Sequence, residues 1–162
     1  MLAHKDPLTN LWNRRAILAQ IQDALSKGPR NATCSAVLYC DLDDFKPIND
    51  RHGHAVGDAL LVEVARRIEA CAPDPAVVGR IGGDEFLIFL PSCEGPPDAL
   101  DAAECIRRAV GDPVGLDGST MRVSISLGVG FATPGDDADA LIAKADRALY
   151  SAKREGRDRV VV

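Results

Sequence analysis

The sequence lacks an excess of basic residues, and this limits the partners it can have. Its 162 residues include 19 lysines and arginines against 24 aspartates and glutamates, which gives a formal net charge of −5. A broad positive face for duplex DNA or for an anionic membrane surface is not expected from this balance. We therefore predict no DNA or RNA partner and no direct membrane contact for this chain.

Long apolar runs and paired cysteine motifs are also missing. No apolar stretch approaches the ~20 residues of a membrane-spanning helix, and the first residues carry no signal-peptide core. The five cysteines are an odd number and form no C-x-x-C pair. This pattern favours reduced thiols over a disulfide framework. We expect a cytoplasmic location, with the parent protein free to carry a membrane anchor elsewhere.

What is present is the composition of an ordinary globular domain. Hydrophobic residues make up 46% of the chain and charged residues 27%, with no internal repeat. We expect residues 1–162 to form a single domain. The abrupt start, shortly before a helix lead-in, is typical of a domain excised from a longer multidomain protein.

Apolar periodicity and turn residues divide the chain into helices and strands. The predicted helices cover residues 13–26, 45–71 with a break at Gly53, 98–110 and 139–154, and the predicted strands cover residues 35–42, 77–81, 85–90 and 121–132, with a short edge strand at 160–162. This order contains a β-α-β-β-α-β core. It predicts an α/β (α+β) sandwich built on an antiparallel sheet.

Three carboxylates are placed where the predicted strands end. Asp41 closes the strand at 35–42, and Asp84 and Glu85 lie in the hairpin between the next two strands. Because these strands are neighbours in such a sheet, the carboxylates can converge, and hard oxygen ligands favour Mg²⁺ or Mn²⁺. The alternative is that Asp41, Asp43 and Asp44 form only a helix N-cap cluster.

Several short motifs accompany these carboxylates in a fixed order. Gly82 and Gly83 lie in the string RIGGDEF, where the absence of side chains lets a nucleotide approach the backbone. Alone, this string indicates only a hairpin. It is preceded by DPLTNLWNRR at 6–15, DLDDFKPIND at 41–50 and GHAVGD at 53–58, and followed by AKREGR at 152–157.

Together these motifs resemble the diguanylate cyclase (GGDEF) family over essentially the whole chain. The resemblance implies a fold similar to nucleotidyl cyclases and the polymerase palm, with a mostly antiparallel five-stranded sheet flanked by helices and a signature β-hairpin. It implies condensation of two GTP molecules into cyclic di-GMP, with release of pyrophosphate. In that reaction a ribose 3′-hydroxyl attacks the α-phosphorus.

The resemblance also implies a set of metal-binding and catalytic residues. Asp41, the main-chain carbonyl of Leu42 and Asp84 match the family's metal positions, with Glu85 beside them. Two Mg²⁺ or Mn²⁺ ions in each half-site would activate the 3′-hydroxyl and neutralise the triphosphate. Asp84, Glu85 and Asp41 are thus the expected catalytic residues. Either Asp84 or a water molecule accepts the proton.

Substrate-binding positions follow from the same resemblance. Asn49 and Asp58 match the positions that read guanine, which predicts GTP as the substrate in preference to ATP. The phosphates are expected at the remaining matched positions, which are the main-chain N–H groups of Asp44, Phe45 and Lys46, the turn at Gly82 and Gly83, and the side chains of Lys46, Lys153 and Arg157. The alternatives are a solvent-facing Asp58, and Lys153 and Arg157 as cations at a helix C-terminus.

The chain departs from the family pattern in one place. Many members have an inhibitory Arg-x-x-Asp product site just ahead of the signature, and here that window reads Pro-Asp-Pro-Ala at 73–76. Product inhibition through this site is therefore not expected. Two hypotheses remain, an active cyclase that works as a two-fold dimer of half-sites, and a GTP-binding regulatory module that controls a neighbouring domain.

Overall fold

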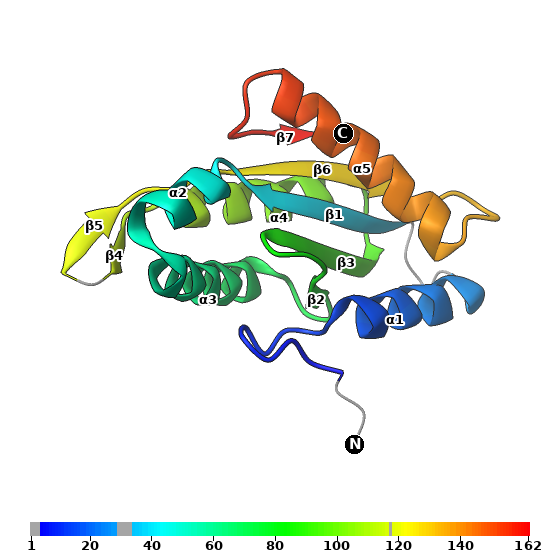
Figure 1. The fold of residues 1–162 in the computed structure, drawn as a ribbon. Coiled ribbons are helices and arrows are strands. Elements are labelled where there is room, and N and C mark those ends of the chain that lie inside the picture. Colours follow the sequence, from blue (N-terminus) through cyan, green and yellow to red (C-terminus); the bar gives the residue numbers. More distant parts are fainter. Residues whose placement is uncertain (1–3, 29–33, 117) are drawn as a thin grey trace.

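A central five-stranded sheet with helices on both faces forms the body of the molecule (Figure 1). The computed structural model describes residues 4–28, 34–116 and 118–162. The strands of this sheet are ordered β2-β3-β1-β6-β7, and every neighbouring pair is antiparallel except β6 and β7, which are parallel. The elements are α1 (Arg14–Ser26), β1 (Cys34–Leu42), α2 (Phe45–His52), α3 (His54–Cys71), β2 (Val77–Arg80), β3 (Glu85–Cys93), α4 (Pro96–Gly111), β4 (Val114–Leu116), β5 (Ser119–Met121), β6 (Ile125–Phe131), α5 (Ala138–Arg154) and β7 (Val160–Val161).

The two faces of the sheet carry separate apolar layers. Alternate residues of β1 point to opposite faces, so Leu38 packs with α3 and α4 whereas Val37 packs with α1 and α5. Both side chains are completely buried. A strand covered on both faces reads as a nearly continuous apolar run, which explains the pattern seen in the sequence. The same alternation places Asp41 on the face of β1 that carries Val37.

Local signals fix where the helices begin and break. Asn13 caps α1, because its Oδ1 accepts a hydrogen bond of 2.9 Å from the N–H of Ala16. Asp137 caps α5 in the same way, through a bond of 2.8 Å from the N–H of Ala140. The break predicted at Gly53 is confirmed. There φ is 90°, in the region that favours glycine, and the chain passes from α2 into α3.

The segment before α1 covers one edge of the sheet. The N–H of Trp12 donates to the carbonyl of Val78 at 3.2 Å, and the N–H of Arg80 donates to the carbonyl of Trp12 at 2.9 Å. These bonds add a short bridge beside β2. At the opposite edge, β7 is only two residues long.

The strand predicted at 121–132 is shorter in the structure. A separate hairpin, which we did not predict, precedes it in the chain. β6 begins only at Ile125, where it pairs with Leu42, and β4 and β5 form a separate two-stranded hairpin. Met121 belongs to this hairpin and not to the central sheet. The alternating apolar pattern therefore spans two elements that a short irregular link separates.

The expectation that all five cysteines are reduced is wrong for one pair. Cys34 and Cys93 are joined by a disulfide, with their Cα atoms 5.4 Å apart. The antiparallel register of β1 and β3 places these two residues directly opposite each other. Cys40, Cys71 and Cys105 are free thiols. In the ranges that the structure describes, no helix combines the length and apolar character needed to cross a bilayer.

Candidate active site

Asp41, Asp84 and Glu85 meet at one end of the central sheet. Asp41 lies opposite Glu85 in the pairing of β1 with β3. The N–H of Leu42 donates to the carbonyl of Asp84 at 3.1 Å, which ties the hairpin to the end of β1. The predicted convergence of the three residues is therefore present in the backbone. The carbonyl of Leu42 belongs to the same strand end.

Asp41 is a buried carboxylate with incomplete compensation. Its Oδ1 is buried and has no hydrogen-bond partner among the described residues, while its Oδ2 lies 3.2 Å from Nζ of Lys153. Burial, together with the negative charge of Asp84, raises the pKa of Asp41 to about 7, although Lys153 acts in the opposite direction. An additional cation at this position would satisfy the open oxygen. The donor set, all oxygen, fits a hard divalent ion.

Glu85 has a different partner. Its Oε2 accepts a hydrogen bond of 3.1 Å from the hydroxyl of Tyr39. Burial and the charge of Glu85 raise the pKa of Tyr39 above its ordinary range, so the hydroxyl remains a neutral donor. Within the described part of the chain, no three His, Cys, Asp or Glu side chains are already arranged as a complete set of metal ligands. Asp84 is the carboxylate whose negative charge acts on Asp41.

Lys153 binds the acidic end of β1 in this structure. Its Nζ lies 2.9 Å from Oδ1 of Asp43 in addition to its contact with Asp41, and its side chain is 22% exposed. Lys153 thus neutralises the position where a cation is expected. Arg157, the other predicted phosphate contact, is exposed and lies in the turn after α5, with its N–H bonded to the carbonyl of Ala152.

Asp43 is an important residue that the sequence analysis considered only as part of an N-cap cluster. It is 4% exposed and accepts four hydrogen bonds. The donors are Ser124 Oγ at 2.6 Å, Ser126 Oγ at 2.7 Å, Lys153 Nζ at 2.9 Å and the N–H of Asp158 at 3.1 Å. Burial opposes ionisation, but these bonds outweigh it and lower the pKa of Asp43. The side chain therefore joins β1 to β6, α5 and the turn before β7.

The N-cap alternative for the acidic cluster gains no support from the geometry. Asp44 occupies the cap position of α2 but makes no side-chain cap hydrogen bond. Its backbone is left-handed, with φ 55° and ψ 36°, which is uncommon for a residue other than glycine. The first N–H groups of α2, which begins at Phe45, have no partner within the helix. Lys46 beside them is exposed.

The two predicted guanine-reading residues lie on the helices that meet at Gly53. The Oδ1 of Asn49, on α2, is buried and has no hydrogen-bond partner among the described residues. Gly57, on α3, leaves the space that this oxygen occupies, because a Cβ there would collide with it. Asp58 follows Gly57 and is exposed. A buried oxygen without a donor fits a ligand that brings one.

Arg80 braces the hairpin that carries Gly82 and Gly83, a role that sequence reasoning missed. Its Nε and Nη2 donate to the carbonyl of Gly83 at 3.1 and 2.8 Å, and its Nη1 lies 3.1 Å from both carboxylate oxygens of Asp6. At Gly82 a Cβ would lie 2.5 Å from Oε1 of Glu85. Arg80 therefore holds the turn through the carbonyl of Gly83, and Glu85 leaves no room for a side chain at Gly82.

The comparisons with known proteins agree with this architecture. Residues 3–159 match the family model described as diguanylate cyclase, GGDEF domain. The diguanylate cyclase TpbB of Pseudomonas aeruginosa is 40% identical over 157 residues, which cover 96% of this chain and 36% of TpbB. An uncharacterised signalling protein of Caulobacter vibrioides is 40% identical over 158 residues, which cover 96% of this chain and 20% of that protein.

Solved structures show the same fold. The GGDEF domain of DgcB from Caulobacter crescentus, determined in complex with c-di-GMP, has a TM-score of 0.92 and 32% identity, and the match covers 99% of this chain and 96% of that one. The isolated GGDEF domain of TpbB has a TM-score of 0.91 and 39% identity, with 98% and 95% covered. This chain thus spans well under half of the curated relatives named above but nearly all of these domains. It belongs to the diguanylate cyclase GGDEF-domain family.

Proposed function

We propose that this domain condenses two molecules of GTP into cyclic di-GMP and two molecules of pyrophosphate. Family membership supports this assignment. The structural observation that carries it is the buried Oδ1 of Asp41, which lacks a hydrogen-bond partner and lies beside Asp84 at the end of β1. A carboxylate in this state is suited to a metal ion, and metal-assisted phosphoryl transfer needs such a site.

Asp41, the carbonyl of Leu42, Asp84 and Glu85 are the residues proposed to hold Mg²⁺ or Mn²⁺, with two ions in each half-site. When bound, the metal lowers the pKa of the ribose 3′-hydroxyl and neutralises charge on the triphosphate. A bound metal ion would take over the neutralisation of Asp41 by Lys153, and the ammonium group, still beside Asp43, could then face the triphosphate. Asp84 or a water molecule accepts the proton of the 3′-hydroxyl.

The other groups bind and orient GTP. Asn49 and Asp58 hydrogen-bond the edge of guanine, and a carboxylate at Asp58 that pairs with guanine N–H groups would be left unpaired by adenine. The first N–H groups of α2, from Asp44 to Lys46, and the turn at Gly82 and Gly83 receive the phosphates. Arg157 adds a cation beside them.

One domain binds one GTP, so the reaction needs two half-sites that face each other about a two-fold axis. Neither half-site holds both the attacking 3′-hydroxyl and the α-phosphate that it attacks. We therefore propose a homodimer that forms transiently or is driven by a partner. Product inhibition through an Arg-x-x-Asp site is absent, because residues 73–76 supply neither the arginine nor the second charge.

Incubation of the protein with GTP and Mg²⁺, followed by chromatography for cyclic di-GMP, tests the assignment. Asp41→Asn and Glu85→Gln should each abolish turnover while the circular dichroism spectrum stays unchanged. Asp23→Asn, on the exposed face of α1, is the matched control and should keep full turnover. Absence of product at high protein concentration, with GTP still bound, would overturn the cyclase assignment in favour of a regulatory GTP-binding module.

A further inference from the structure

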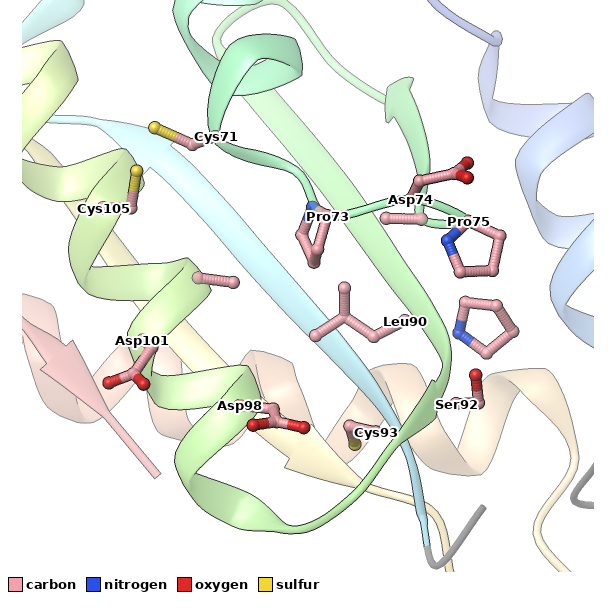
Figure 2. A pocket seen from close by; sticks show the side chains of 13 residues that line it. Cys71, Pro73, Asp74, Pro75, Leu90, Ser92, Cys93, Asp98, Asp101 and Cys105 are labelled. Atoms are coloured by element: carbon pink, nitrogen blue, oxygen red, sulfur yellow. The ribbon is translucent and has the colours of Figure 1, made fainter. Parts of the chain in front are cut away.

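Two free cysteines meet between α3 and α4, away from the residues assigned to GTP. Cys71 is the last residue of α3, and Cys105 lies in the middle of α4. Figure 2 shows their sulfur atoms side by side at one wall of a pocket, with Cys93 at the far side of the same pocket. Cys105 lies close enough to Cys71 to affect the pKa of its thiol. We call Cys71 and Cys105 the cysteine pair.

The packing of α3 against α4 sets the relative position of Cys71 and Cys105. Nη1 of Arg67 on α3 donates to the carbonyls of Ala109 and Asp112 at the end of α4, at 2.9 and 2.7 Å. The helices run in opposite directions (Figure 1), so one turn forward from Arg67 and one turn back from Ala109 lead to the cysteine pair. The Arg67 bonds therefore hold the two thiols in register.

The two thiols differ in accessibility. Cys105 is exposed and Cys71 is partly buried. Burial, together with the neighbouring thiol of Cys105, raises the pKa of Cys71 to about 12. A dissolved reagent therefore reacts first with Cys105, and Cys71 is the neighbouring thiol that can react in a second step.

The pocket in front of the pair is negative. Its volume is about 430 Å³, and three carboxylates line it, those of Asp74, Asp98 and Asp101, with no lysine or arginine among those lining residues that the structure describes. The basic side chains that follow Cys105 on α4 are already paired, since Arg107 and Arg108 both bind Glu104. A small reagent with positive charge should accumulate here, and one with negative charge should be repelled.

We propose that the cysteine pair is a redox-active dithiol that closes into a disulfide when it reacts with a small cationic disulfide. The thiolate of Cys105 attacks one sulfur of the reagent, the S–S bond of the reagent breaks, and one thiol leaves. Cys71 then loses its proton and attacks the sulfur of Cys105, which expels the second thiol. Cys71 and Cys105 together lose two electrons and two protons, and the reagent is reduced to two thiols.

The product would link the end of α3 to α4. Such a bond restricts the unfolded chain and should raise the thermal midpoint by several degrees. It lies at the opposite end of α3 from Asp58, so the proposal stands or falls independently of GTP turnover.

Cystamine, which carries two ammonium groups, is the probe. Treatment of the whole chain, followed by digestion with trypsin and Glu-C, should yield a fragment in which Cys71 and Cys105 are cross-linked. Cleavage after Glu94 and Glu104 separates this bond from the Cys34–Cys93 disulfide in the fragment map. Cys71→Ser should instead keep one cysteamine on Cys105, because the second step is removed, and Cys105→Ser should react far more slowly than the wild type.

Two results would overturn the proposal. The first is a stable cysteamine adduct on Cys105 of the wild type with no cross-linked fragment. The second is an equal rate with oxidised glutathione, which is negatively charged, since the lining of the pocket predicts a rate about tenfold lower than with cystamine at low salt. Cys105→Ser keeps the test informative if Cys71→Ser does not fold, because the exposed position tolerates the change.

Discussion

Among single residues, Gly57 has the clearest steric role in the proposed nucleotide site. Alanine would normally stabilise a helix by about 1 kcal/mol relative to glycine. Here a Cβ would collide with Oδ1 of Asn49 and come within 3.3 Å of Cζ of Phe45. We predict that Gly57→Ala displaces Asn49 and weakens GTP binding at least about tenfold, as measured by isothermal titration calorimetry.

Gly111→Ala provides the matched control for this prediction. Gly111 also lies in a helix, and a Cβ there would meet nothing within 4 Å. This variant should bind GTP as the wild type does. Equal affinity in the Gly57 and Gly111 variants would contradict the proposed position of guanine.

We expect Lys153 and a bound divalent ion to be alternative sources of positive charge beside Asp41. Lys153→Met removes the cation that Asp41 and Asp43 share. This variant should therefore have a thermal midpoint several degrees lower in metal-free buffer. Added Mg²⁺ should restore part of this loss, because it neutralises the same carboxylates. Differential scanning fluorimetry with and without Mg²⁺ measures the effect.

Lys27→Met removes an exposed ion pair with Asp23 and serves as the comparison. Its thermal midpoint should change little, and its response to Mg²⁺ should match the wild type. If Mg²⁺ stabilised the Lys153 and Lys27 variants equally, the lysine would not share its site with the metal.

The sequence allowed the carboxylates at the sheet end to be predicted, because strand ends and a hairpin are local features. The contact between Lys153 and Asp41 was not predictable, since it joins the end of β1 to the last turn of α5. The same holds for Asp43. Its four donors come from the residue before β6, from β6 itself, from α5 and from the turn after α5, and no local pattern brings them together.

Among the elements, the lead-in segment and the signature hairpin depend on each other through Asp6. This carboxylate accepts bonds from the N–H and hydroxyl of Thr9 at 2.8 and 2.7 Å and from Arg80, which in turn holds Gly83. Burial opposes ionisation, but these bonds outweigh it and lower the pKa of Asp6. The hairpin geometry therefore relies on a charge outside the sheet.

This shift predicts a pH dependence of stability. Because the folded pKa lies below the ordinary value of about 3.9, the charge of Asp6 stabilises the fold fully above that value. The contribution is lost as the pH falls through the folded pKa. Asp6→Asn should therefore be less stable than the wild type by about 1 kcal/mol near pH 6, and this difference should shrink toward pH 3.

Urea denaturation of both proteins across this pH range tests the prediction. Asp23→Asn again serves as the control, and its difference from the wild type should stay small throughout. A difference for Asp6→Asn that grew as the pH fell would contradict the assigned sign.

Most elements could be predicted because their signals are local. Gly53 interrupts an apolar helical pattern, and the interruption is real. The β4–β5 hairpin was missed although the dipeptide Asp117-Gly118 is a recognised hairpin signal, because the apolar alternation after Met121 suggested one longer strand. The pairing of Cys34 with Cys93 depends on strand register, which single-sequence patterns do not specify.

For the whole molecule, activity should depend on how often two copies meet. We predict that the rate per protomer rises with protein concentration. A parallel coiled coil fused ahead of Asp6 should raise this rate at low concentration, because it increases the effective concentration of the second half-site. Turnover assays over a dilution series measure the effect, and a rate per protomer that is unchanged by both treatments would contradict the two-half-site mechanism.

The bridge between Trp12 and β2 also has a protective consequence. Without residues before Arg14, β2 would become a sheet edge with unsatisfied backbone N–H and C=O groups, and such edges pair with one another between molecules. A chain shortened to begin at Arg14 should therefore aggregate on concentration, as measured by light scattering, while the chain that starts before Asp6 stays dispersed. The lead-in segment should thus keep two molecules from joining through their sheets and leave them free for the proposed encounter through their nucleotide sites.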